Sequence, residues 1–257
     1  MSDDEVKRIL EDMEKQGFPV EVRTSEILKA HDWEVTNQAA YSDIQKGKHR
    51  TVDIVAEKNV LYKPDKLGFD IWLVIECKRS TKPWAFYSSD IDLDKEEVRR
   101  KFVSSSQLDI NQIAYQKGLH EKIIDLIRNR FLFKNRLALP TFRKLAHASF
   151  EPFTEGKGMS LHKAQMQVRS AILDMEENLD YMERMTAFPY GIFFVPIIVF
   201  DGHLYTYENR ELKTTEGLYY YVTMYGSAFM IEILTIQFFE RYLTTLEANT
   251  QSFKSET

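Results

Sequence analysis

The sequence has a single cysteine and no long apolar segment. Cys77 alone cannot form an intrachain disulfide, and no group of Cys and His residues has the spacing of zinc ligands. The longest uncharged apolar stretch runs from Tyr190 to Phe200, well short of the roughly 20 residues that a membrane-spanning helix needs. Residues 1–5 are acidic where a secretion signal is basic and then apolar. These absences predict a cytoplasmic protein with no membrane span.

The sequence also has no internal repeat, no low-complexity tract and no overall basic charge. Its net charge is −5, yet residues 117–147 hold eight Lys and Arg against two acids, so this window carries +6 and the remainder −11. Phenylalanines lie among these bases, which is compatible with a surface that follows a phosphate backbone. A solvated helical face with an apolar underside explains the window equally well. The candidates for nucleic-acid contact in it are Lys134, Arg136, Arg143 and Lys144.

Hydrophobic periodicity and turn signals predict helices and strands in a mixed order. Helices are expected at 2–16, 19–31, 161–185 and 228–246, and strands at 33–41, 50–57, 69–78, 192–200, 204–207 and 218–225, with a frayed tail after residue 247. The charged residues 88–158 lack a strong strand signal and are expected to form a helical, partly basic insertion. The prediction is therefore an α/β fold with a mixed sheet flanked by helices, whose core comprises residues 1–87 and 159–257 on either side of the insertion.

A pair of carboxylates and an amine stand at the ends of two expected strands. The apolar run that begins at Phe69 ends in Glu76-Cys77-Lys78, and Asp53 lies inside the apolar residues 52–56. Side chains alternate along a strand, so Glu76 and Lys78 are expected on one face, about 7 Å apart. The Cys77 side chain then points to the opposite face, while its backbone carbonyl can reach a metal ion.

Oxygen ligands that converge on one point are what a divalent cation requires in phosphodiester hydrolysis. We expect Asp53 and Glu76 to be such ligands and Lys78 to orient the attacking water or stabilise the pentavalent oxyanion. The alternative is that these are ordinary polar residues at strand ends. A carboxylate in apolar surroundings costs several kcal/mol unless it is paired or bound to a metal, which favours the functional interpretation.

The phrases Arg50-Thr51-Val52-Asp53-Ile54-Val55-Ala56 and Val74-Ile75-Glu76-Cys77-Lys78-Arg79-Ser80 resemble the PD-(D/E)xK nuclease superfamily. The following Lys82-Pro83-Trp84 resembles uncharacterised bacterial members. The resemblance covers residues 18–84 and the helix at 161–185, with Val52 in place of the proline. It implies a restriction-endonuclease-like fold, binding of Mg²⁺ or Mn²⁺ through Asp53 and Glu76, and catalysis by Lys78. The superfamily also contains inactive members.

Further site residues follow from the resemblance. A helix acid of the family corresponds to Glu21 or Glu26; Glu21 shares an inner face with Ser25 and Leu28 and is preferred. Gln167 precedes Val168 in a phrase that resembles one beside the site of related nucleases, although a surface glutamine explains it as well. Lys82 and Trp84 are further candidates for nucleic-acid contact. Trp84 could stack on a base or cover the sheet edge.

Three hypotheses result. The leading one is a Mg²⁺-dependent endonuclease that hydrolyses phosphodiester bonds, expected to act on DNA in restriction, phage defence or repair, and as a homodimer if it cuts both strands of a duplex. The second is a catalytically silent module of the same fold that binds nucleic acid or a protein partner. The third is a protein-interaction component that uses the tyrosines at 219–221 and 225.

Overall fold

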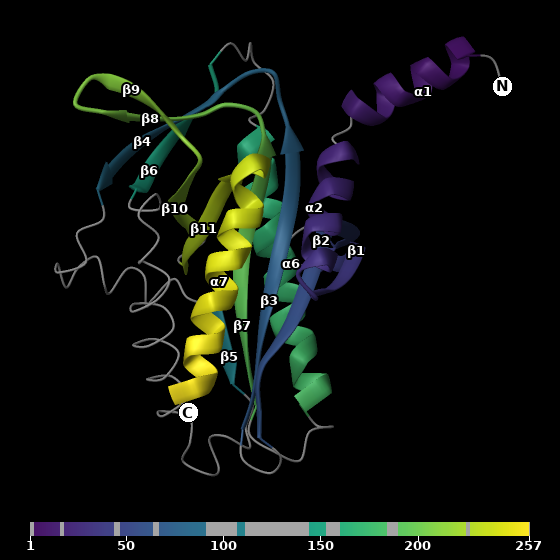
Figure 1. The fold of residues 1–257 in the computed structure, drawn as a ribbon, viewed down its shortest axis with the longest axis vertical. Helices are drawn as coiled ribbons and strands as arrows, with labels where there is room; N and C mark the ends of the chain where they lie inside the picture. Colours follow the sequence, from purple (N-terminus) through teal and green to yellow (C-terminus); the bar gives the residue numbers. More distant parts are fainter. Residues whose placement is uncertain are drawn as a thin grey trace.

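The computed structural model describes residues 3–15, 18–43, 47–63, 67–90, 107–110, 144–152, 160–183, 190–224 and 227–256. These residues form one mixed sheet with helices on both faces (Figure 1). The helices are α1 (Asp3–Lys15), α2 (Phe18–Ala30), α6 (Ser160–Glu183) and α7 (Ile236–Glu256). The strands are β1 (Glu34–Asp43), β2 (Lys48–Lys63), β3 (Leu67–Arg79), β4 (Trp84–Asp90), β5 (Gln107–Ile110), β6 (Lys144–Phe150), β7 (Tyr190–Asp201), β8 (Leu204–Glu208), β9 (Glu211–Thr215), β10 (Gly217–Met224) and β11 (Ser227–Thr235).

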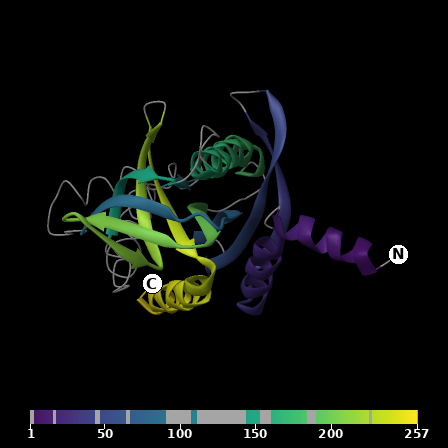
Figure 2. The same cartoon turned by 90° about the horizontal axis from the view of Figure 1, so that it is seen from above.

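The strand order in the sheet is β1-β2-β3-β7-β11-β10-β6-β4-β8-β9, and β5 pairs with β7. Strand β2 runs antiparallel to both β1 and β3, whereas β7 is parallel to β3 and to β11. In Figure 2, α6 lies on one side of the sheet and α2 and α7 lie on the other. The central strands β3 and β7 are therefore covered on both faces, which explains their continuous apolar sequences.

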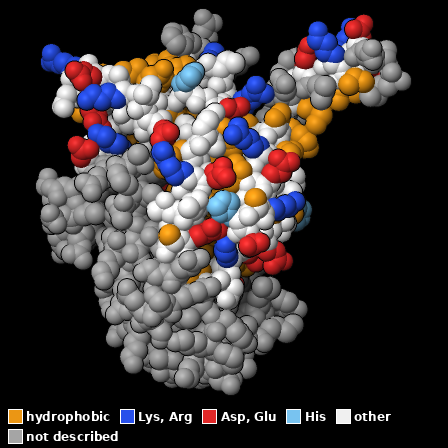
Figure 3. Space-filling model, in the orientation of Figure 1, with side chains coloured by type: hydrophobic (Ala, Val, Ile, Leu, Met, Phe, Trp, Pro, Cys, Tyr) orange, Lys and Arg blue, Asp and Glu red, His pale blue; other side chains and the backbone are white. Residues whose placement is uncertain are grey.

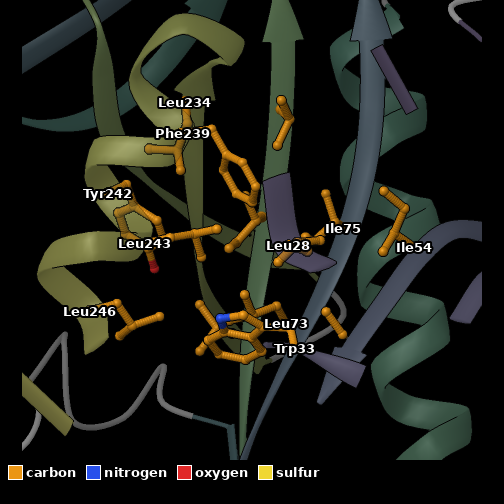
Figure 4. Close-up of a cluster of buried hydrophobic side chains, with 14 of the residues drawn as sticks. Leu28, Trp33, Ile54, Leu73, Ile75, Leu234, Phe239, Tyr242, Leu243 and Leu246 are labelled. Atoms are coloured by element: carbon orange, nitrogen blue, oxygen red, sulfur yellow. The ribbon is translucent and has the colours of Figure 1, made fainter. Parts of the chain in front are cut away.

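Two hydrophobic clusters fill the two faces. The first contains Leu73 and Ile75 of β3 together with side chains from α2 and α7 (Figure 4). The second contains Val74 of β3 and the buried face of α6. On α6 the residues Ala164, Val168, Ala171 and Ile172 are fully buried, at the spacing of one helix face.

The structure corrects the expected helical nature of residues 88–158. Where the structure describes these residues in regular elements, they form the end of β4, strand β5 and strand β6. Strand β6 pairs with β4 and β10, so it belongs to the main sheet. Residues 91–106, 111–143 and 153–159 lie outside the described residues, and the division at 88 and 158 stays a prediction.

The expected helix at 228–246 is also wrong in its first half. Residues 227–235 form β11, and α7 begins at Ile236 and continues to Glu256 instead of fraying after Glu247. Side chains 229–234 are buried on both faces of the sheet. Apart from Glu232 this run is apolar at every position, so its pattern shows neither the period of two nor that of 3.6 and cannot distinguish a buried strand from a helix.

Helix α1 confirms the helix expected at 2–16. Its apolar stripe is partly exposed at Val6, Ile9 and Met13, and Val22 of α2 is exposed as well. In Figure 1, α1 projects away from the sheet. Among the described residues, no helix is both long enough and apolar enough to cross a bilayer.

Candidate functional site

The candidate site lies where β2 and β3 separate. The ladder between these strands ends at the pair Ile54–Ile75, although β2 remains paired with β1 and β3 remains paired with β7 up to Arg79. The next residues on the two strands are Asp53 and Glu76. The two strands therefore separate at Asp53 and Glu76, the two carboxylates singled out from the sequence.

Asp53 replaces the missing ladder partner of β3. Its Oδ2 accepts a hydrogen bond of 2.7 Å from the backbone N–H of Cys77. This N–H faces the fork, where no β2 carbonyl is available, and a buried backbone donor needs an acceptor. The contact fixes the Asp53 carboxylate against the strand that carries Glu76 and Lys78.

Glu76 is a buried carboxylate with one satisfied oxygen. Its side chain is 1% exposed, Oε1 accepts a hydrogen bond from Nζ of Lys78, and Oε2 is buried without a hydrogen-bond partner among the described residues. Burial raises the pKa of Glu76 to about 7, Lys78 opposes that rise and Asp53 adds to it. Such a group favours a second cation beside it.

Glu21 reaches the fork from the first turn of α2. Its carboxylate accepts a hydrogen bond of 2.8 Å from Nε2 of Gln38, and it is only half-buried. Burial raises the pKa of Glu21; the Gln38 hydrogen bond and Lys78 lower it, and Asp53 raises it. The charges of Asp53 and Lys78 therefore influence the pKa of both Glu21 and Glu76. Glu26, the alternative helix acid, is exposed.

The Cys77 side chain lies on the opposite face, as expected from strand alternation. It belongs to the cluster that contains Leu73 and Ile75, and its Sγ contacts Oγ1 of Thr24 at 3.7 Å. Burial raises the pKa of the Cys77 thiol well above its usual range, and the charge of Asp53 raises it further. A thiol in this state is a packed side chain and a poor nucleophile.

Tyr41 is a site neighbour that the sequence did not single out. Its side chain is buried, and burial raises its pKa to about 12, with Arg50 lowering it and Asp43 and Glu76 raising it. Tyr41 packs in the hydrophobic cluster that contains Val74 and the buried face of α6, and the charge of Glu76 contributes to its raised pKa. A single tyrosine in an expected strand gave no signal for this influence.

Two of the described candidates for nucleic-acid contact, Trp84 and Lys144, have partners within the protein. Trp84 is buried and stacks on Phe200, with ring centroids 3.9 Å apart, so it covers the sheet and its ring is not free to stack on a base. Lys144 forms ion pairs with Glu208 and Asp90. Lys82 is exposed beyond the end of β3. Figure 3 shows basic and acidic side chains interspersed over the described surface in that view.

Gln167 is half-buried on α6, and its Oε1 is buried without a hydrogen-bond partner among the described residues. The neighbouring Gln165 is more deeply buried, and its Nε2 is likewise unpartnered there. No hydrogen bond joins Gln167 to the four side chains of the fork in the described part of the chain. Lys134, Arg136 and Arg143 lie outside the described residues.

The possible metal ligands at the fork are few, which suits a cation that keeps most of its bound waters. Among the described residues no three His, Cys, Asp or Glu side chains form a metal-ligating group. The fork offers two carboxylates, Asp53 and Glu76, and the backbone carbonyl of Cys77 lies between Glu76 and Lys78 in the chain. This set fits Mg²⁺, which keeps several waters and uses one or two carboxylates. The unpartnered Oε2 of Glu76 is the atom that a cation would satisfy.

Comparison with protein-family models, with curated protein sequences and with solved structures finds no match for this chain.

Proposed function

We propose that the protein is a metal-dependent nuclease with a restriction-endonuclease-like core. The observation that carries the proposal is the fork between β2 and β3, where Asp53 accepts a hydrogen bond from the Cys77 N–H and Lys78 contacts the buried Glu76. The regions that resemble the PD-(D/E)xK superfamily are the segment from α2 to β3, which contains the fork, and helix α6. Helices α2 and α6 pack on opposite faces of the sheet there, which supports the same assignment. The buried Oε2 of Glu76, which has no hydrogen-bond partner among the described residues, also supports a bound cation at this position.

Each residue has a distinct role in the proposed reaction. Asp53 and Glu76, with the Cys77 carbonyl, would hold Mg²⁺ or Mn²⁺, which supplies charge neutralisation at the phosphate and lowers the pKa of a bound water. Lys78 lies beside Glu76 and can donate to the attacking water or to a phosphoryl oxygen. Glu21, which accepts a hydrogen bond from Gln38, can accept a proton or a hydrogen bond from water. DNA is the substrate class that the resemblance favours.

The test is cleavage of labelled single-stranded and double-stranded DNA and RNA with Mg²⁺, Mn²⁺ or EDTA. We expect cleavage that EDTA abolishes and that Asp53→Asn reduces by about two to four orders of magnitude. The matched control is Asp32→Asn. Asp32 is exposed just after α2 and has no part in the proposed reaction. Full activity of Asp53→Asn, or cleavage that persists in EDTA, would reject the proposal.

One observation favours a second candidate, a catalytically silent module that binds nucleic acid. In the described residues both carboxylates already have protein donors, Cys77 N–H for Asp53 and Lys78 for Glu76, and no three-residue metal group exists. Such a module would bind labelled DNA in a gel-shift assay with equal affinity in EDTA and in Mg²⁺. It would show no cleavage, and Lys78→Ala would leave binding unchanged.

A further inference from the structure

One residue of β1 breaks the regularity of its strand. Gln38 has a φ of 51°, in the left-handed region that is uncommon for residues other than Gly, Asn and Asp. It lies inside β1, between the paired positions Asn37–Ile54 and Ala39–Val52, and it faces Asp53 without a ladder pairing in the described β1–β2 register. Backbone of this kind within a strand persists when surrounding contacts hold it.

The side chains of both strands change faces at this point. On β1, Val35 packs against the cluster on the α2 and α7 face, whereas Ala39 packs against the cluster on the α6 face. On β2, Ile54 belongs to the first cluster and Val52 to the second. Residues two apart on a regular strand share a face, so both strands rotate locally at Gln38 and Asp53. Such local irregularities re-aim side chains beside functional sites.

The Gln38 side chain also connects the elements around the fork. Its Nε2 donates to Oε1 of Glu21 at 2.8 Å, and its Oε1 accepts a hydrogen bond of 3.0 Å from Oγ1 of Thr51. Both ends of the amide are therefore used, one on the α2 acid and one on β2. The amide fixes the direction of the Glu21 carboxylate, which has the raised pKa described above.

We infer that Gln38 is a positioning residue of the site: its left-handed backbone turns Asp53 toward the Cys77 N–H, and its amide holds Glu21. The consequence for catalysis rests on the proposed nuclease function, whereas the positioning of Asp53 does not. The Asp53–Cys77 hydrogen bond is a direct reporter of that positioning, because it exists only while the Asp53 side chain points into the fork.

The test separates the backbone of Gln38 from its side chain. Gln38→Gly keeps the left-handed conformation accessible, and Gln38→Val excludes it because a β-branched residue is a severe outlier there. Ala40→Val, at an exposed and extended position of β1, is the matched control. The first readout is amide hydrogen exchange of Cys77 measured by NMR relative to Leu73, which is paired on both sides in β3.

We expect Gln38→Val to accelerate Cys77 exchange by about tenfold or more relative to Leu73, while Gln38→Gly and Ala40→Val leave it near the wild-type rate. Mn²⁺ titration calorimetry should show about 10-fold to 100-fold weaker binding for Gln38→Val, the usual cost of losing support for a ligand. For an active enzyme, Gln38→Gly should lower kcat with KM unchanged, because the amide acts through Glu21.

Wild-type exchange of Cys77 in Gln38→Val would overturn the inference, whatever the protein does to nucleic acid. Equal acceleration in Ala40→Val would also overturn it, because the effect would then belong to the strand as a whole. Failure of the wild-type protein to bind Mn²⁺ or to cut any nucleic acid would instead reject the proposed function. The exchange comparison still decides the role of Gln38 in that case.

Discussion

At the scale of single residues, the fork between β2 and β3 holds a carboxylate whose ionised form is disfavoured by burial. Glu76 is buried beside Asp53, with Lys78 as its charged partner, and its pKa of about 7 reflects mainly the loss of hydration. Ionised groups in such surroundings destabilise the folded state, and functional sites are where proteins retain them. The free energy of unfolding should therefore depend on pH in a way that changes when Glu76 is replaced.

We expect Glu76→Gln to stabilise the protein at pH 8 in the absence of divalent metal. The pKa of Glu76 rises from 4.5 to about 7 on folding, so the associated stability is complete below about pH 4.5 and is lost as the pH rises through 7. The full effect is about 3 kcal/mol, and because the variant also loses the Lys78 ion pair, we expect a net gain of about 1–3 kcal/mol. Urea denaturation at pH 5 and pH 8 measures it.

The control for this experiment is Glu26→Gln, since Glu26 is exposed on α2. It should change the free energy of unfolding by less than about 0.5 kcal/mol at either pH. A Glu76→Gln variant that is less stable than the wild type at pH 8 would show that the Lys78 ion pair outweighs the desolvation of Glu76.

At the scale of elements, the helices and strands with a clear hydrophobic period were predicted from the sequence. The third strand, the strand at 190–201 and the helix at 160–183 were predicted within two residues at most ends, because each has a clear apolar pattern with a turn or cap beside it. Strand β11 could not be predicted, since Phe229 to Leu234 are apolar on both faces of the sheet apart from Glu232.

The candidate site was predictable only where it follows strand ends. Asp53, Glu76 and Lys78 stood out because charged residues interrupt apolar runs. The role of Gln38 carried no sequence signal, since it depends on a left-handed backbone inside a strand and on the approach of α2. Contacts between elements that are distant in the chain cannot be inferred from the period of either element alone.

Helix α7 is tied to α2 and β2 by a polar clamp at Glu247. Its Oε1 accepts hydrogen bonds from Lys58 at 2.6 Å and from Nε1 of Trp33 at 3.0 Å, and its Oε2 lies 2.8 Å from Nδ1 of His31. Burial raises the pKa of Glu247, but these donors outweigh it, so the net pKa lies below its usual value. The clamp fastens the C-terminal helix to the elements that carry Glu21 and Asp53.

We expect Glu247→Ala to lower the free energy of unfolding by about 2–3 kcal/mol at pH 7, because it removes charge-assisted hydrogen bonds and leaves Lys58 without its charged partner, with only the His31 carbonyl as acceptor. The contribution of Glu247 should decrease as the pH falls below its usual pKa, since its folded-state pKa is lowered. Glu240→Ala, exposed on the same helix, is the control in thermal denaturation. Equal losses in the two variants would contradict the clamp.

At the scale of the whole molecule, the sheet extends well beyond the strands that carry the candidate site. Strand β6 pairs with both β10 and β4, and β5 pairs with β7, so parts of the chain between 88 and 158 are integral to the sheet. A true insertion could be removed at a loop without exposing ladder groups. Removal here would expose the edges of β10 and β7.

We therefore expect replacement of residues 88–158 by a short Gly/Ser linker to abolish cooperative folding. The loss includes the pairing of β6 with β10 and a buried segment around Leu145 and Ala146. Thermal unfolding followed by circular dichroism measures it. A soluble deletion variant with a cooperative transition near that of the full chain would show that these residues form a separable unit.

The central claim is that the fork between β2 and β3 hydrolyses phosphodiester bonds, and single-turnover cleavage by Lys78→Ala tests it most directly. Lys78 contacts Glu76 and is 22% exposed, so its ammonium can reach a substrate. With saturating Mg²⁺, we expect Lys78→Ala to cut labelled DNA about two to four orders of magnitude more slowly than the wild type, while Lys213→Ala, at an exposed position of the edge strand β9, retains the wild-type rate constant for cleavage. Equal rates for Lys78→Ala and the wild type would contradict the account.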